Sequence, residues 1–266
     1  MARSIDHIVI AVRDLARASA DFARAGFTVT PGGEHASGDT HNALITFGDG
    51  SYFELIAFKE PDRPQEHRWW PRLQKGEGYV DFALASDDLE AEAAQLRQRG
   101  LEVEGPIDGG RTRPDGERLE WRTIQLSDAA GLPLPFVIQD VTDRALRVPG
   151  GTATEHPLGV THVDGVTVAV GNLVQSADDF AAITGTNGKS SASSIAGVRA
   201  AQRFPIGKQW IELVEPDASQ SDLRQYLERR GTGPYEVVLG GAGASAEIGK
   251  LLPLDATHGA RIRIGH

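Results

Sequence analysis

An internal repeat constrains the fold of this chain more than any other feature of its sequence. Three pairs of segments match in one register, 158 residues apart: 6–15 with 164–173, 20–22 with 178–180, and 52–56 with 210–214. Three matches without a net gap are hard to obtain by chance. A repeat of this kind indicates that the chain is built from copies of one supersecondary unit, and that neighbouring copies bury each other's apolar faces.

Two further matches divide each half of the chain again. Residues 76–84 correspond to 231–239, and residues 115–119 correspond to 258–262. The chain therefore contains about four related units, at 4–58, 77–140, 160–216 and 232–266. The last unit is truncated and is expected to stop after its third strand. We expect two domains, 1–140 and 160–266, joined by a linker at 141–159 that contains Pro and Gly.

Each unit is predicted to have a βαβββ order, so that the fold class is α+β. In the first unit, alternating apolar and β-branched residues predict a strand at 5–12, followed by a helix that ends at Gly26. The first unit is predicted to have its helix at 14–24 and its later strands near 27–30, 41–47 and 51–58. The second unit is predicted to have a strand at 79–85, a helix near 88–99, and strands near 101–104, 117–126 and 134–139. One helix covers only one face of such a sheet, so two units are expected to pair around a concave interior.

Short stretches of the chain carry a resemblance to a known family. They are residues 6–9, 40–45, 50–56, 113–116 with 121–122, and 135–136. Together with the repeat, they resemble the glyoxalase-like domain family of the vicinal oxygen chelate superfamily, which includes glyoxalase I, bleomycin and fosfomycin resistance proteins, and extradiol dioxygenases. The resemblance covers essentially the whole chain and implies a fold of tandem βαβββ modules. It does not select a reaction, because the superfamily hosts isomerases, lyases, dioxygenases and binding proteins.

The resemblance also implies a divalent metal site. In the superfamily, ligands come from the first and fourth strands of paired units, and these positions hold His7, Glu54 and Asp81. This ligand set suits Zn, Ni, Fe(II) or Mn, and it leaves coordination positions open for substrate or water. Phe136 occupies the fourth position and cannot bind a metal, so the four-ligand site of glyoxalase I is absent. The alternatives are a half-buried strand histidine for His7 and a carboxylate paired with an arginine for Glu54.

Glu54 and His41 are the candidate catalytic residues. His41 lies beside Asn42 on a predicted strand, where it is expected to face the same interior and to carry a proton or donate a hydrogen bond to substrate. The alternative is a histidine at a strand end that structures the hairpin. His35 and His67 are interpreted as loop residues.

The second half lacks the histidine of this set. Its residues at the positions of His7, Glu54 and Asp81 are Gly165, Glu212 and Glu236. We therefore expect any chemistry in the first half of the chain, with the second half serving as structure or as part of the substrate boundary.

Composition and charge argue against several classes of partner. The 266 residues include no cysteine and carry a formal net charge of −10, with a pI of about 5.3. Nucleic acids and anionic membranes attract proteins with a basic face, so neither is an expected partner. No apolar stretch approaches the ~20 residues of a membrane span, and the N-terminus shows no signal-peptide pattern. The expected location is cytoplasmic.

Four arginines cluster around a predicted hairpin of the second unit. They are Arg111, Arg113, Arg118 and Arg122. A small anionic substrate could use some of them. For most of the four, we favour the alternative that they are solvated charges flanking the strands.

The leading functional hypothesis is a metal-dependent lyase or isomerase that acts on a small oxygenated molecule. A ring-cleaving dioxygenase is less favoured, because its iron usually takes two histidines and one glutamate, and His41 would have to be the second histidine. The alternative is a metal-free protein that binds a small molecule or an antibiotic, as bleomycin resistance proteins do. The chain is expected to be a monomer or a homodimer.

Overall fold

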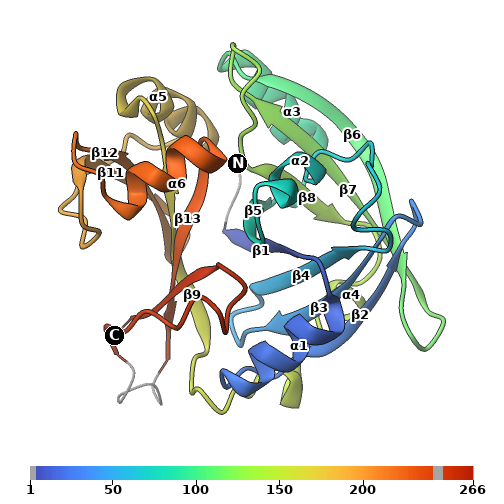
Figure 1. Ribbon diagram of the computed structural model, residues 1–266. Coiled ribbons are helices and arrows are strands. Elements are labelled where there is room, and N and C mark those ends of the chain that lie inside the picture. The colour runs from blue at the N-terminus through green and yellow to red at the C-terminus, as the bar shows by residue number, and fades with distance from the viewer. Residues whose placement is uncertain (1–3, 242–247, 266) are drawn as a thin grey trace.

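The computed structural model describes residues 4–241 and 248–265 (Figure 1). Residues 1–3, 242–247 and 266, which the predicted domains include, lie outside the described part. In that part, no helix has the length and apolar character needed to cross a bilayer.

The first unit has the predicted βαβββ order. Its elements are β1 (Ile5–Val12), α1 (Leu15–Arg24), β2 (Thr30–His35), β3 (Thr40–Thr46) and β4 (Tyr52–Phe58). Helix α1 begins after Asp14, whose side chain accepts a hydrogen bond from the main-chain nitrogen of Arg17 at 2.9 Å. Gly26 follows the end of the helix with φ of 95°, a left-handed conformation that glycine adopts without a steric penalty.

The second unit repeats this order and closes a barrel with the first. Its elements are α2 (Trp70–Gln74), β5 (Gly78–Ala85), α3 (Leu89–Gln98), β6 (Glu102–Thr112), β7 (Arg118–Ser127) and β8 (Phe136–Asp140). The strand order around the barrel is β1-β4-β3-β2-β6-β7-β8-β5. The two units meet at two antiparallel seams, β1 with β5 and β2 with β6. Closure removes the free strand edges and encloses an interior to which both units contribute.

The second strand of each unit differs from its prediction. Strand β2 begins at Thr30, whereas a strand near 27–30 was predicted, and β6 extends to Thr112 instead of ending near 104. Both strands contain a register shift, between Pro31 and Gly33 in β2 and after Glu104 in β6. Irregular strands with Pro and Gly lack the apolar alternation on which the prediction depended.

Strands β2 and β6 form the seam that has fewer paired positions. Strands β2 and β6 are paired at two positions, Glu34 with Thr112 and His35 with Arg111. His35 of the first unit therefore lies directly across from Arg111 of the second.

The segment predicted as a linker packs against the barrel. It contains α4 (Arg144–Arg147) and a 3-10 helix, η1 (Gly151–Thr154). His156 accepts a hydrogen bond from the main-chain nitrogen of Thr28 at 3.0 Å. Its other ring nitrogen lies 3.0 Å from the main-chain oxygen of Thr46. These contacts hold the segment beside the first unit.

The second half forms an open six-stranded sheet. Its elements are β9 (His162–Ala169), α5 (Leu173–Thr184), β10 (Lys189–Ser190), β11 (Val198–Ile206), β12 (Gln209–Pro216), α6 (Asp222–Arg230), β13 (Gly233–Gly240) and β14 (Arg261–Ile264). The strand order is β10-β11-β12-β9-β13-β14. Figure 1 shows this sheet standing beside the barrel.

The fourth unit is truncated, but not at its end. Strand β14 pairs parallel with β13, as the last strand of the first unit, β4, pairs parallel with β1. The prediction that this unit stops after its third strand was therefore wrong. The described residues between β13 and β14 contain no full strand, and the third strand is represented only by an isolated antiparallel bridge between Leu251 and Arg263 of β14. Residues 242–247, in the region where a helix would follow β13, lie outside the described residues.

One hydrophobic core joins the two halves. It includes Phe22 of α1, Leu96 of α3 and Phe180 of α5, each almost fully buried. Burial of one such side chain stabilises the fold by roughly 1.5–3 kcal/mol. The barrel interior has a separate apolar cluster. The opposite face of the second sheet is covered by α6, where Leu223 packs with Tyr235.

Candidate active site

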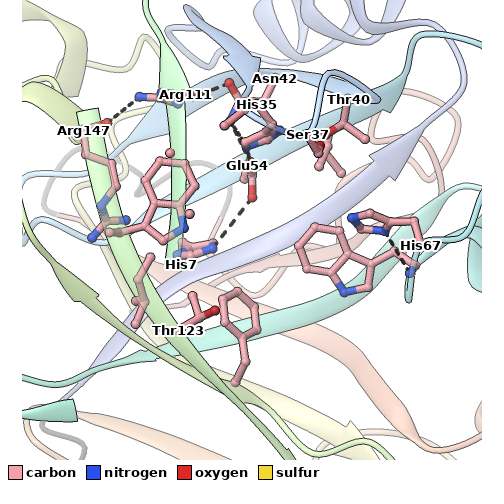
Figure 2. Close-up of a pocket in the computed structure, with 18 of the residues that line it drawn as sticks. His7, His35, Ser37, Thr40, Asn42, Glu54, His67, Arg111, Thr123 and Arg147 are labelled. Carbon is pink, nitrogen blue, oxygen red and sulfur yellow. Dashed lines mark hydrogen bonds and ion pairs between the residues drawn. The ribbon is translucent and has the colours of Figure 1, made fainter. Parts of the chain in front are cut away.

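The barrel contains a cavity of about 260 Å³ that residues of both units line. Trp69, Trp121 and Phe136 contribute aromatic rings to it. The part that we call the polar wall consists of His7, His35, Asn42, Glu54 and Arg111. In Figure 2, hydrogen bonds and ion pairs link these residues in succession from Arg111 through Glu54 to His7.

Glu54 is a buried carboxylate in the middle of the polar wall. Its Oε1 accepts a hydrogen bond from Asn42 at 2.6 Å and lies 3.3 Å from Nε2 of His35. Its Oε2 lies 3.7 Å from Nε2 of His7. Burial acts to raise the pKa of Glu54, but the hydrogen bonds from His35 and Asn42 and the nearby imidazoles outweigh it and lower the pKa to about 2. Glu54 is therefore ionised at neutral pH.

His7 is held in one orientation by three neighbours. Its Nδ1 lies 2.7 Å from Oδ1 of Asp6. Its ring stacks on Tyr52 with a centroid distance of 4.6 Å and meets the ring of Phe136 edge-on at 5.4 Å. A carboxylate on one ring nitrogen determines which nitrogen carries the proton. Nδ1 therefore donates to Asp6, and Nε2 remains to face Glu54.

Asp6 is anchored by the segment that follows the barrel. Arg147 donates hydrogen bonds to both oxygens of Asp6, at 2.9 and 3.0 Å, and Arg144 donates a third at 2.5 Å. Burial acts to raise the pKa of Asp6, but Arg147 and His7 hold that pKa well below its usual range. Arg147 also donates to the hydroxyl of Tyr52 at 2.7 Å. The same arginine thus positions two neighbours of His7.

His41 does not line the cavity that the sequence predicted it to face. Side chains alternate between the two faces of a strand. On β3, Thr40 and Asn42 line the cavity, and His41 between them is half-buried outside it. Burial lowers the pKa of His41, and nearby Lys59 lowers it further. The proton carrier expected at this strand is therefore not placed beside Glu54.

Asp81 is engaged by residues other than His7 and Glu54. Its Oδ2 accepts a hydrogen bond from the indole nitrogen of Trp69 at 3.0 Å and pairs with Arg68 at 2.7 Å. Its Oδ1 accepts from its neighbour's main-chain nitrogen at 2.9 Å. Asp81 borders a smaller pocket at the junction of the two halves.

These contacts decide how well the implied ligand set fits a divalent metal. His7 and Glu54 approach each other, but both oxygens of Asp81 are occupied. Among residues 4–241 and 248–265, no group of three or more His, Cys, Asp or Glu side chains is arranged to hold a metal ion. The three-ligand set that the resemblance implied therefore does not fit a metal in this geometry.

Two histidines that were interpreted as loop residues line the cavity. His35 is the last residue of β2, with Nδ1 2.8 Å from the hydroxyl oxygen of Thr40. Its ring meets Trp121 edge-on at 6.0 Å. His67 does lie in a loop, between β4 and α2, and it also borders the cavity. His35 rather than His41 is therefore the second histidine near Glu54.

The described residues of the second half do not repeat the polar wall. Gly165 stands at the position of His7, and the indole of Trp210 occupies the space beside it. A Cβ atom on Gly165 would lie 2.2 Å from that ring. Glu212, at the position of Glu54, pairs with Arg203 at 3.0 Å. At these two positions, packing and an internal ion pair thus take the place of the polar wall.

Comparison with known proteins agrees with the barrel and its repeat. A family model described as a glyoxalase-like domain matches residues 5–184. The chain belongs to the glyoxalase-like domain family. The vicinal oxygen chelate fold recognised from the sequence is thereby confirmed for this glyoxalase-like chain. No curated protein sequence matches it.

Solved structures share the fold of this glyoxalase-like chain. A hypothetical protein from Staphylococcus aureus has a TM-score of 0.73 and 17% identity, over 98% of both chains. A variant of 4-hydroxymandelate synthase from Streptomyces coelicolor has a TM-score of 0.59 and 16% identity, over 90% of this chain and 71% of that one. A xylose isomerase-like TIM barrel/4-hydroxyphenylpyruvate dioxygenase fusion protein has a TM-score of 0.56 and 15% identity, over 96% and 41%. At these identities the likeness shows the fold alone.

Proposed function

We propose that the barrel cavity is the active site of a lyase or isomerase that moves a proton on a small oxygenated molecule. The observation that carries the proposal is the position of Glu54, an ionised carboxylate that lies 3.3 and 3.7 Å from the Nε2 atoms of His35 and His7. A carboxylate and an unprotonated ring nitrogen repel each other, so a proton is expected between them. The polar wall therefore carries an exchangeable proton at the surface of the cavity.

The structure supports different roles for the carboxylate and the imidazoles. Glu54 has a pKa of about 2 and is too weak a base to accept a proton efficiently at neutral pH. We assign it to stabilise positive charge on its neighbours. Imidazole is the side chain whose ordinary pKa suits proton transfer near neutral pH. His7 and His35 have Nδ1 bonded to Asp6 and Thr40, so Nε2 of each is the proposed proton-carrying atom.

Deuterium exchange into a panel of simple compounds tests the proposed proton transfer. Small 2-oxo and 2-hydroxy acids and their amides are incubated with the protein in deuterated water, and exchange at the carbon next to a carbonyl or carboxyl group is followed by NMR. We expect at least one compound to exchange, and His7→Gln or Glu54→Gln to slow that exchange about 100-fold or more, the usual contribution of a positioned acid or base. The matched control is Glu212→Gln, at the equivalent position of the second half, which should exchange at the wild-type rate. No exchange with any compound, or equal rates in wild type and His7→Gln, would argue against the reaction.

Metal analysis of the same proteins tests the dependence on metal that the resemblance implied. Zn, Ni, Fe and Mn are measured in the purified wild type and in a His7→Ala/Glu54→Ala double variant. One equivalent of a metal in wild type that is lost in the double variant would establish a metal-dependent enzyme with these two residues as ligands. Unchanged trace metal in both proteins supports proton transfer by the side chains themselves.

A binding protein is the second candidate function, and the aromatic lining favours it. The rings of Trp69, Trp121 and Phe136 give the cavity an apolar surface that can hold a ligand without reaction. Stoichiometric binding of a compound that never exchanges or turns over would support this function over catalysis.

A further inference from the structure

Arg111 is a buried cation that forms no ion pair with any carboxylate among the described residues. Its side chain is almost fully buried, with 3% of the residue exposed, and it lines the cavity. One terminal nitrogen donates to the side-chain oxygen of Asn42 at 3.2 Å, and the other donates to the main-chain oxygen of Arg147 at 2.8 Å. Both acceptors are neutral. Its Nε is also buried and has no acceptor among the described residues.

The other arginines of the cavity have their charges balanced. Arg147 pairs with Asp6 at 2.9 Å, and Arg68 pairs with Asp81 at 2.7 Å. Within residues 4–241 and 248–265, Arg111 is thus the arginine of this cavity that forms no ion pair. Its hairpin neighbours differ from it: Arg113, Arg118 and Arg122 form ion pairs at the surface, as expected for solvated charges.

Burial of an unpaired charge is costly, so the arrangement requires a physical reason. A buried cation is normally paired with an anion or satisfied by several hydrogen bonds. Burial lowers the pKa of Arg111, while the nearby Tyr52 and Glu54 act to raise it. Glu54 is not in contact with the guanidinium, because the amide of Asn42 lies between them. A bound anion would supply the missing partner.

The surroundings of Arg111 are shaped to admit its side chain. A Cβ atom on Gly32 would lie 2.8 Å from a terminal nitrogen of Arg111 and 2.0 Å from the side-chain oxygen of Asn42. A Cβ atom on Gly109 would lie 2.4 Å from the indole nitrogen of Trp121. Glycines at these two positions thus make room for the guanidinium and for an aromatic ring of the same cavity.

We propose that Arg111 binds the carboxylate of the molecule that enters the barrel, so that the ligand is a small carboxylic acid with an apolar body. The inference rests on the proposed function in taking this cavity as the substrate site. One guanidinium matches one carboxylate, to which it can donate two parallel hydrogen bonds. The rings of Trp121 and Phe136 match the apolar body. A carboxylate on Arg111 places the rest of the ligand along the polar wall, toward Glu54 and the two histidines (Figure 2).

Phenylacetate and phenylacetamide are a matched pair of probes for this inference, because they share size and shape and differ in charge. Isothermal titration calorimetry measures the affinity of each for the full chain. We expect wild type to bind phenylacetate at least ten times more tightly than phenylacetamide. Arg111→Met should remove this preference, whereas Arg111→Lys should keep part of it, because lysine retains the charge but not the fork of donors. The matched control, Arg113→Met, changes an arginine of the same hairpin that pairs with Asp115 at the surface, and it should keep the full preference.

Equal affinity for acid and amide in wild type would overturn the inference, as would a preference that survives in Arg111→Met. Should Arg111→Met fail to fold, the wild-type preference and its decrease in Arg111→Lys still decide the matter, since a purely structural arginine would give neither. The result is separate from the proposed reaction. If the protein prefers the acid through Arg111 but exchanges no proton, the inference about Arg111 holds and the proposed reaction is contradicted. If it exchanges acids and amides at equal rates and binds them with equal affinity, the reaction is supported and the inference about Arg111 is contradicted.

Discussion

The low pKa of Glu54 predicts a specific dependence of stability on pH. The pKa is about 2 in the folded protein and 4.5 in its ordinary range. A carboxyl whose pKa is lowered by folding contributes stability above its unfolded pKa, and this contribution is lost as the pH falls through the folded pKa. The full contribution is about 3 kcal/mol, since each pKa unit corresponds to about 1.4 kcal/mol. About 2 kcal/mol of it is lost between pH 6 and pH 3.

Glu54→Gln removes this contribution while it preserves the shape of the side chain. Urea unfolding of wild type and variant is followed at several pH values from 6 to 3. The free energy of unfolding of wild type minus that of the variant should decrease by about 2 kcal/mol over this range. Glu117→Gln, on an exposed turn, controls for the loss of a carboxyl and should show the wild-type pH dependence. Parallel curves for wild type and Glu54→Gln would refute the conclusion that the fold holds Glu54 ionised.

Two further predictions concern packing and charge elsewhere in the chain. Arg147→Met removes the arginine that donates hydrogen bonds to both oxygens of the buried Asp6. This change should lower the free energy of unfolding by about 3–5 kcal/mol. Arg144→Met, in which a side chain 40% exposed is changed, should cost less than about 1 kcal/mol; equal losses in urea unfolding would contradict this account. Gly165→Ala should cost about 1–3 kcal/mol because its Cβ meets the ring of Trp210. That cost should largely disappear in a Trp210→Leu background, and a double-mutant cycle without coupling would show that the ring is not responsible.

Most of the fold could be predicted from the sequence because each element of one unit could be compared with its equivalent in another unit. The offset that relates β1 to β9 also relates the helices and the last strands of the units, so each assignment supports the others. The prediction failed where a unit has no equivalent to compare. The fourth unit lacks full second and third strands among its described residues. Strand β14 was therefore predicted to be the third strand of the unit, whereas its parallel pairing with β13 makes it the equivalent of the last strand.

The candidate site was only partly predictable, because two of its residues follow glycine pairs. His35 comes after Gly32-Gly33, and Arg111 comes directly after Gly109-Gly110. Glycine normally weakens a strand, and the predicted strands, near 27–30 and 101–104, both ended before these residues. The structure gives the glycines another role, since close approach of side chains requires them at 32 and 109. Glycine pairs at similar places in two repeated units are the signal that would have extended both strands.

The contacts of Asp81 could not be predicted from a strand pattern. Asp81 lies on β5, opposite Val9 of β1, the strand that bears His7. Its contacts are decided by Arg68 and Trp69, which precede α2 and have no counterpart in the strand pattern. Position along a strand fixes which face a side chain occupies, but neighbours from loops decide what that side chain bonds to.

The seam between β2 and β6 links ligand binding to the integrity of the barrel. It has two paired positions, and one of them joins His35 of the first unit to Arg111 of the second. Neither unit alone contains both residues. A molecule that contacts both is bound only by the closed form, and it stabilises that form in proportion to its affinity and concentration. A ligand that contacts both residues would therefore stabilise the seam that has only two paired positions, and the barrel would be hardest to open when its cavity is occupied.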